Sequence, residues 1–312
     1  MVNNGLLPWR RFGFDLDEIS DKLKIDREEI HEYRIDSKKL SISLIFYTKY
    51  NFTQDKFTLS NQSRIKFAYD SPQSIVQVIE DYQTFQKTLQ FITGNTQHFL
   101  AIHYLCNKCN VSGQLYFEDQ KYENFHISYF TIEYEDIYPY LFAILNTIYT
   151  DKRFNFCLDK LLDNHRGKQI SHSKRFTNSI ASFEGYCKIY MNRKNAKLNW
   201  FLIENKGLIC SITKMNDHKF DNFVIKIVRS RNYYVHSNID DSNLENIFSE
   251  FELLYLSFTI DIIVAINLLR QISIPQIILD KIIVRGTSIY HHMQIINKEL
   301  STDSLLNTKN MI

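Results

Sequence analysis

The chain has 312 residues, 44% hydrophobic and 23% charged, which is ordinary for a globular protein with a sizeable core. Only 8 Gly and 4 Pro occur, which argues against long disordered linkers, and the net charge of +2 excludes a polycation. The two halves differ, because residues 1–150 hold 15 Lys and Arg against 19 Asp and Glu, and residues 151–312 hold 22 against 16. The second half is better suited to binding a polyanion, although the charge of an ordinary protein surface explains this modest difference equally well.

Five cysteines, at positions 106, 109, 157, 187 and 210, form no disulfide framework, and no signal peptide is recognisable, so we expect a cytoplasmic protein. The longest apolar run, Phe251–Leu269, has a helical period and contains Glu252 and Asp261. Because a carboxylate in the middle of a membrane span is costly, we expect no membrane partner.

Residues 1–36 show a rough amphipathic pattern that predicts two short helices, with Ile19, Leu23 and Ile30 among the apolar positions. The pattern faintly resembles a helix-turn-helix. The stretch is acidic, however, and DNA is a polyanion, so ordinary packing helices are the preferred interpretation.

From Leu40 the hydrophobic period changes to two, which predicts an antiparallel sheet with turns at residues 53–55 and 61–63. A helix follows, opened by Ser71 and Pro72 and stopped by Gly94 after Thr93. The predicted strands are Ser41–Tyr50, Lys56–Leu59, Arg64–Tyr69, His98–Leu105, Gly113–Phe117 and Phe125–Glu133.

One pair of cysteines, Cys106 and Cys109, has the C-x-x-C spacing of zinc ligands, with His103 nearby and His126 as a candidate fourth ligand. No second C-x-x-C pair exists in the sequence. Two reduced thiols are therefore the preferred interpretation, and we expect no metal or other cofactor.

The polar stretch Asn164–Ser173 is the best domain boundary, after connecting helices in residues 136–165. Beyond it, apolar residues at helical spacing predict a bundle that includes the helix Arg175–Arg193. The fold class is therefore α+β, with a β-rich N-terminal domain at residues 1–165 and an all-α domain at residues 166–312.

The end of the bundle carries three further signals. Asp240, Asp241 and Ser242 with Glu245 predict a capping box at the start of a long helix. This helix is apolar on more than one face, so we expect it to need a partner as well as a core, which predicts a homodimer. Pro275 predicts a final short helix, and the tail from Lys298 is expected to fray.

A helix that begins at Asp217 carries an apolar stripe, and Arg231 falls on this stripe. A guanidinium with a buried stem requires an anion, and Glu184, the sole acid of the helix Arg175–Arg193, is the predicted partner. The pair either only fixes two helices together or also aims Arg231 at a phosphate. The stripe consists of Val224, Ile227, Val228 and Val235.

Arg231 is followed by Asn232 and, five positions on, by His236, a set suited to metal-free RNA cleavage. His236 can exchange a proton with a ribose hydroxyl or a leaving oxygen, Arg231 can hold the phosphate, and Asn232 can orient either. Arg231 and His236 lie about 140° apart on an ideal helix. Either the helix end is distorted or a second protomer completes the site. Arg229 shares the face of His236 and is expected to contact the RNA backbone.

The sequence R-N-x-x-x-H from Arg231 to His236 resembles the signature of the HEPN superfamily of ribonucleases, and its flanks resemble the ApeA-type branch. The RF start and Glu184 of the helix Arg175–Arg193 carry this resemblance, as does the segment NLLRQISIP, and it covers about residues 170–285. It implies dimers with facing motifs that cleave single-stranded RNA without a metal and leave a cyclic phosphate.

The resemblance also implies a toxin-like endoribonuclease that defends against phage by abortive infection, with a phage-derived trigger as a further partner. Arg231, His236, Asn232 and Glu184 would be its catalytic residues. The alternative is a catalytically silent HEPN module for dimerisation or sensing, in which the Arg and His serve only the interface. Growth arrest that His236→Ala relieves while the dimer persists would favour the enzyme.

Overall fold

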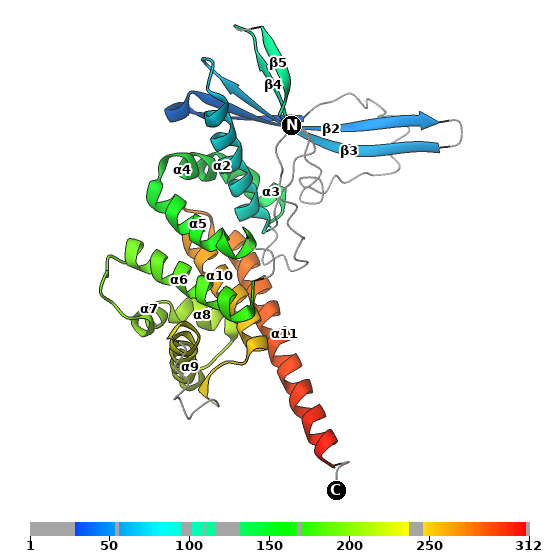
Figure 1. The fold of residues 1–312 in the computed structure, drawn as a ribbon. Coiled ribbons are helices and arrows are strands. Elements are labelled where there is room, and N and C mark those ends of the chain that lie inside the picture. The colour runs from blue at the N-terminus through cyan, green and yellow to red at the C-terminus, as the bar shows by residue number, and fades with distance from the viewer. Residues whose placement is uncertain are drawn as a thin grey trace. The chain divides into compact units, whose positions relative to one another are not determined.

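The computed structural model describes residues 29–53, 56–94, 102–108, 110–115, 132–166, 170–236 and 246–309. Within these ranges only the backbone is described for residues 48–53, 56–61, 115, 165–166, 236 and 299–309. The chain divides into two compact units, one of residues 1–126 and 131–151 and the other of residues 127–130 and 152–312 (Figure 1). Strands occur in the described part of the first unit and only helices in that of the second, which confirms the α+β class.

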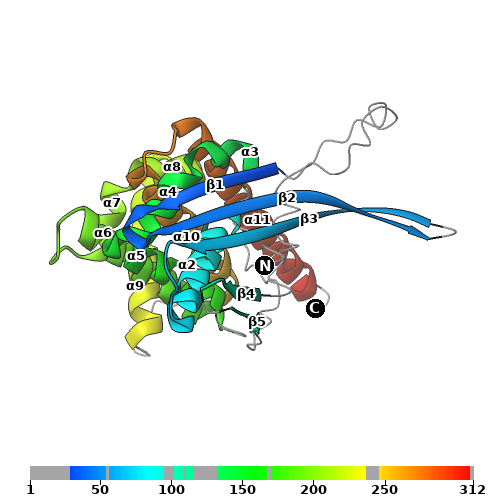
Figure 2. The same cartoon turned by 90° about the horizontal axis from the view of Figure 1, so that it is seen from above.

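The first unit contains an antiparallel sheet in the order β1-β2-β3, formed by β1 (Glu29–Ile35), β2 (Leu40–Thr53) and β3 (Lys56–Tyr69). Figure 2 shows the strands side by side, with β2 and β3 continuing beyond β1 as a two-stranded ribbon. The predicted turn at residues 61–63 is wrong. Ser63 is fully buried and pairs with Phe46 inside a continuous strand.

Residues 29–35 also differ from the expectation, because they form the strand β1 rather than the end of a helix. Tyr33 and Ile35 are buried at a spacing of two, and the pairing of Ile35 with Leu40 across a short 3-10 turn sets the register. The remainder of the predicted helical pair, residues 1–28, lies outside the described residues.

Helix α2 (Ile75–Thr93) joins the sheet through Asp81, which is 2% exposed. The Tyr69 hydroxyl donates to the Asp81 carboxylate over 3.0 Å, and Lys38 lies 3.7 Å from it. Burial, followed by the charge of Asp81, raises the pKa of Tyr69, so this hydroxyl stays protonated and remains a donor. The body of the predicted helix and its stop are confirmed, since Gly94 has a φ of 70° at the C-cap. The predicted start at Ser71 and Pro72 is wrong, because the helix begins at Ile75 with Ser74 as its N-cap.

The rest of the first unit consists of a hairpin and short helices. The hairpin, β4 (Ile102–Cys106) and β5 (Val111–Leu115), confirms two predicted strands in part. The last predicted strand, Phe125–Glu133, lies outside the described residues up to position 131. The helices are α3 (Tyr134–Ile137), the 3-10 turn η3 (Tyr138–Tyr140) and α4 (Leu141–Thr150), and α4 packs against β1 and α2.

The second unit is a helical bundle in which α6 and α10 form the most extensive contact and α5 packs on α6. Helix α5 belongs to this unit, so the predicted boundary between residues 165 and 166 lies one helix later than the division of the structure. The helices are α5 (Lys152–Arg166), α6 (His172–Tyr190), α7 (Leu198–Glu204), α8 (Lys206–Thr213), α9 (Asp217–His236), α10 (Glu250–Gln271) and α11 (Gln276–Lys309).

Helix α10 is the centre of the bundle, and it is buried on all its faces from Leu256 to Leu269. By length and composition it could cross a membrane, but 83% of its apolar window is buried inside the structure, which is typical of a core helix. Because the chain itself covers α10, its apolarity is no longer an argument for a dimer. The helix starts at a capping box of Ser249 and Glu252, so the start predicted at residues 240–245 is wrong; those residues lie outside the described part of the chain.

The final helix, α11, has 34 residues, so the prediction of a short helix with a frayed tail from Lys298 is wrong. Its first half packs on α8 and α10. Gly286 allows this approach, because a Cβ there would lie 3.2 Å from Ile212 and 3.3 Å from Ile262.

Candidate functional site

Helix α9 carries the predicted site, and its buried face fixes the direction of every other side chain on it. Asn216 accepts a hydrogen bond from the backbone N–H of Lys219 over 3.0 Å, as an N-cap residue does. Val235, predicted to belong to the buried stripe, is 47% exposed, because the stripe passes through Ser230 instead. The buried residues are Phe220, Phe223, Val224, Ile227 and Ser230.

Arg231 lies at the edge of this stripe, with its side chain 31% exposed. Its Nη2 is 3.8 Å from Oε2 of Glu184 on α6, whose side chain is 17% exposed. Its Nη1 donates to Oδ1 of Asn232 over 3.2 Å. The structure therefore brings three of the predicted residues together, and α6 and α9 pack against each other at this point.

The remaining predicted site residues lie on the outer side of α9. Asn232 and Arg229 are both exposed. The backbone of α9 is helical through His236, but the side chain of His236 lies outside the described residues. A continuous helix keeps Arg231 and His236 about 140° apart, so a distorted helix end does not bring them together.

Two residues that the sequence did not single out hold α9 against the segment before α10. The Ser230 Oγ accepts the backbone N–H of Phe248 over 2.8 Å, and the Tyr234 hydroxyl donates to the carbonyl of Phe248 over 3.2 Å. Ser230 and Tyr234 flank Arg231 on the inner side of the helix. The continuation of the buried stripe by steps of three and four was the signal that could have identified them.

Tyr234 acts as a structural donor rather than an acid or base. Burial is the main factor that raises its pKa, followed by the electrostatic influence of Glu250, Tyr233 and then Glu252. The hydroxyl thus stays protonated at neutral pH. Lys226 adds to the same contact, because its Nζ lies 4.3 Å from the centre of the Phe248 ring and 3.6 Å from Glu252.

A buried polar cluster lies on the other side of α6, between α5 and α10. The Asn164 amide donates to Oγ of Ser179 over 2.8 Å and to Oδ2 of Asp261 over 3.3 Å. Burial raises the pKa of Asp261 to about 7, although Ser179, Asn164 and Arg175 act in the opposite direction. This cluster joins three helices.

Two of the four predicted zinc ligands, His103 and Cys106, are described, whereas Cys109 and His126 lie outside the described residues. The side chain of Cys106 has intermediate exposure. Across the described ranges, no group of three or more His, Cys, Asp and Glu side chains is arranged to hold a metal ion.

The arrangement on α9 combines a positioned guanidinium, a carboxylate next to it and an amide within one turn of a histidine. A guanidinium in this setting can bind a phosphate and stabilise negative charge on it. The adjacent carboxylate limits the directions in which the guanidinium can point.

Comparisons with known proteins agree with this picture. The family model described as Apea-like HEPN matches residues 120–276, a range that contains α3 to α10 and therefore both Glu184 and Arg231. No curated protein and no solved structure matches the chain. With half of its length matched by the family model, the chain belongs to the Apea-like HEPN family.

Proposed function

We propose that this chain is a metal-independent endoribonuclease that cleaves single-stranded RNA. HEPN proteins are commonly ribonucleases, and HEPN domains generally act as dimers and bind RNA. The observation that carries the proposal is the contact of Arg231 with Glu184 and Asn232 on a partly exposed face of α9. The Arg231 side chain stays 31% exposed beside the carboxylate and the amide, so its guanidinium can still reach a phosphate.

The proposed reaction is an attack of a ribose 2′ oxygen on the adjacent phosphorus, which breaks the bond to the 5′ oxygen. The 2′-OH loses a proton, the 5′ oxygen gains one, and the product is a cyclic phosphate. His236 exchanges a proton at one of these oxygens, because an imidazole titrates near neutral pH. Arg231 binds the phosphate and stabilises its growing charge, with Asn232 and Glu184 holding the guanidinium. Arg229 contacts the RNA backbone next to the site.

The active unit of this proposal is a homodimer. Arg231 and His236 diverge by about 140° along a helix that stays regular to position 236. Two copies of α9 that face each other bring the Arg231 of one protomer to the His236 of the other. A twofold axis would create two such sites, since each surface meets its own copy.

The biological setting that we propose is phage defence. RNA cleavage in the cytoplasm would halt an infected cell, as in abortive infection by a toxin. A phage-derived trigger would release the activity, and the β-rich first unit is the part of the chain available to detect it.

The test is cleavage of a labelled single-stranded RNA by the purified protein with a metal chelator present. Cleavage by the wild type and by His291→Ala, an exposed histidine of α11, but not by His236→Ala, would support the proposal. Cleavage that disappears with the chelator would refute it. If the wild type stays inactive even with extract of phage-infected cells while a folded dimer forms, the chain is instead a silent module.

A further inference from the structure

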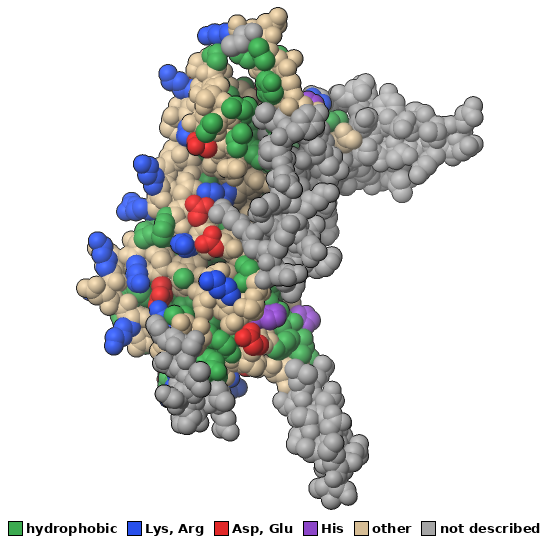
Figure 3. Space-filling model, viewed as in Figure 1, with side chains coloured by type: hydrophobic (Ala, Val, Ile, Leu, Met, Phe, Trp, Pro, Cys, Tyr) green, Lys and Arg blue, Asp and Glu red, His purple; other side chains and the backbone are tan. Residues whose placement is uncertain are grey.

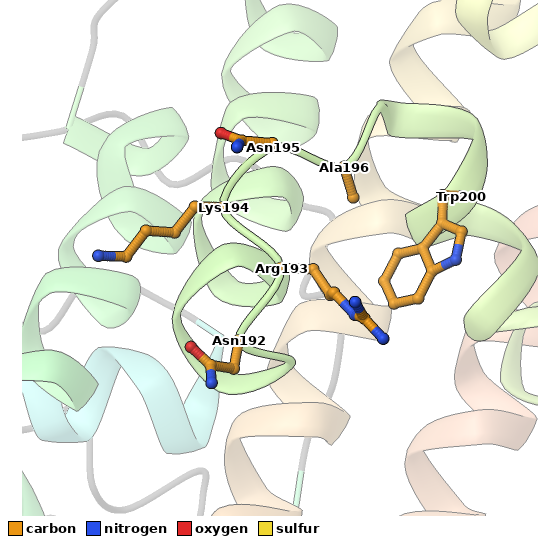
Figure 4. A pocket seen from close by; sticks show the side chains of 6 residues that line it. All are labelled: Asn192, Arg193, Lys194, Asn195, Ala196 and Trp200. Atoms are coloured by element: carbon orange, nitrogen blue, oxygen red, sulfur yellow. The ribbon is translucent and has the colours of Figure 1, made fainter.

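The connection between α6 and α7 forms an open pocket of about 600 Å³. Its volume lies within the range of roughly 300–1,000 Å³ that is usual for sites of small ligands. Figure 4 shows the side chains of Arg193 and Trp200 next to each other in this pocket. The lining residues are Asn192, Arg193, Lys194, Asn195, Ala196 and Trp200.

Local structure holds the pocket in shape. Asn192 follows the C-cap of α6 with a φ of 52°, a left-handed conformation that Asn tolerates better than most residues. A turn follows, closed by a hydrogen bond of 3.2 Å from the N–H of Ala196 to the carbonyl of Arg193. Trp200 is partly exposed on α7, and its neighbour Phe201 is fully buried and anchors that helix.

The segment around the pocket is strongly basic, and two of its cations, Arg193 and Lys194, line the pocket. From Gly185 to Ile203 the sequence has four cations and no Asp or Glu. All four cations are exposed, and within the described residues none of them forms an ion pair. Figure 3 shows Lys and Arg side chains along the side of the molecule where α6 and α7 lie. The cations are Lys188, Arg193, Lys194 and Lys197.

Cations around a partly exposed indole match one class of ligand. Proteins that bind single-stranded nucleic acid combine cations for the phosphates with aromatic side chains on which bases stack. The guanidinium of Arg193, 5.9 Å from the centre of the Trp200 ring, adds a second flat group to the stack. The amides of Asn192 and Asn195 provide donors and acceptors for a base edge.

The pocket also lies on a path from the candidate active site. Glu184 and Lys188 are one helical turn apart and therefore share a face of α6, on which Lys188 is exposed. About 9 Å of helix separates Glu184 from the last residue of α6, and the pocket begins two residues later. An RNA strand bound at Arg231 would pass Lys188 on its way to the pocket.

We propose that the pocket of Arg193 and Trp200 is a second binding subsite for single-stranded RNA, where one base stacks on the indole and the adjacent phosphates meet Arg193 and Lys194. The inference rests on the proposed RNA substrate. It adds a place where the strand is held apart from the site of cleavage, and this subsite would influence which nucleotides are positioned for cutting.

The experiment measures the affinity of a fluorescent single-stranded RNA for the full-length His236→Ala protein with chelator present, so that cleavage plays no part. Trp200→Ala is expected to weaken binding by about five- to a hundredfold, the effect of losing one stacked base. Arg193→Ala should weaken binding and lower the slope of log affinity against log salt by about 0.7. Trp200→Ala should leave that slope unchanged.

Two controls keep the outcomes distinct. Arg285→Ala removes an exposed cation of α11 and should leave the affinity unchanged. The chain has 2 tryptophans, so the substitution Trp9→Phe leaves Trp200 as the source of tryptophan fluorescence. Binding of RNA should quench this fluorescence. The subsite would be refuted if the Trp200→Ala and Arg193→Ala variants bound the RNA as tightly as the parent protein does. It would also be refuted if polyglutamate displaced the fluorescent RNA as well as unlabelled RNA does. Such a result would leave the cleavage assay, and with it the proposed function, unaffected.

Discussion

The buried carboxyl group of Asp261 predicts a specific dependence of stability on pH, which the substitution Asp261→Asn tests. Asp261 lies on α10, 1% exposed, next to Asn164 of α5 and Ser179 of α6. Among the residues that the structure describes, its Oδ1 has no hydrogen-bond partner. Ionisation in this place is costly because the charge loses its hydration.

The magnitude follows from the pKa. Burial raises the pKa of Asp261 from an ordinary value of 3.8 to about 7. The folded state therefore holds the proton more tightly than the unfolded chain, so the stabilisation is complete below about pH 4 and is lost as the pH rises through about 7. At about 1.4 kcal/mol per pKa unit, the difference of roughly three units corresponds to a loss of about 4 kcal/mol.

The assay is urea unfolding of wild type and Asp261→Asn between pH 4 and pH 8. An amide cannot ionise, so the variant should gain up to about 4 kcal/mol relative to the wild type across this range. Asp221→Asn, at an exposed position of α9, is the control and should show no such trend. A difference between wild type and Asp261→Asn that stays constant with pH would refute the reasoning.

Three further substitutions test other contacts. Glu184→Gln should lower kcat for RNA about tenfold with little change in KM, while the free energy of unfolding changes by less than about 1 kcal/mol, because a partly exposed ion pair contributes little to stability; an unchanged kcat would assign the pair to packing alone. Ser230→Ala should cost about 1–3 kcal/mol in urea unfolding, since the buried N–H of Phe248 loses its acceptor, and faster hydrogen exchange of that amide would locate the effect. Gly286→Val should destabilise the bundle by about 1–3 kcal/mol, because the added methyl groups meet Ile212 and Ile262; unchanged thermal unfolding would contradict the close approach of α11.

Elements with strong local signals could be predicted from the sequence. The apolar spacing of α2 and its stop at Gly94 are local, and the structure reproduces both. The start of α10 shows the limit of such signals, because the pattern S-x-x-E occurs at Ser242 and again at Ser249. The second one caps the helix, where Ser230 and Tyr234 hold the preceding residue, Phe248, against α9. That choice depends on contacts distant in sequence.

The candidate site was predictable to a similar extent. The pairing of Arg231 with Glu184 follows from a charge that requires a counter-charge, and the structure places the two side chains 3.8 Å apart. The burial of Ser230 in place of Val235 could be predicted only from its position three residues after Ile227 in the stripe, because a small polar residue adds no apolar signal of its own. The pocket of Arg193 and Trp200 arises only when the turn after α6 brings α7 beside it.

The most direct test of the central claim uses a heterodimer. One copy would carry Arg231→Ala and the other His236→Ala, and purification through two different tags would separate it from the homodimers. Each variant homodimer should be inactive on labelled RNA with chelator present. The heterodimer should recover about half of the wild-type rate, because one of its two sites combines an intact Arg231 with an intact His236. A heterodimer as inactive as its parents would contradict a site shared between protomers, and full activity of either homodimer would contradict the role of that residue in cleavage.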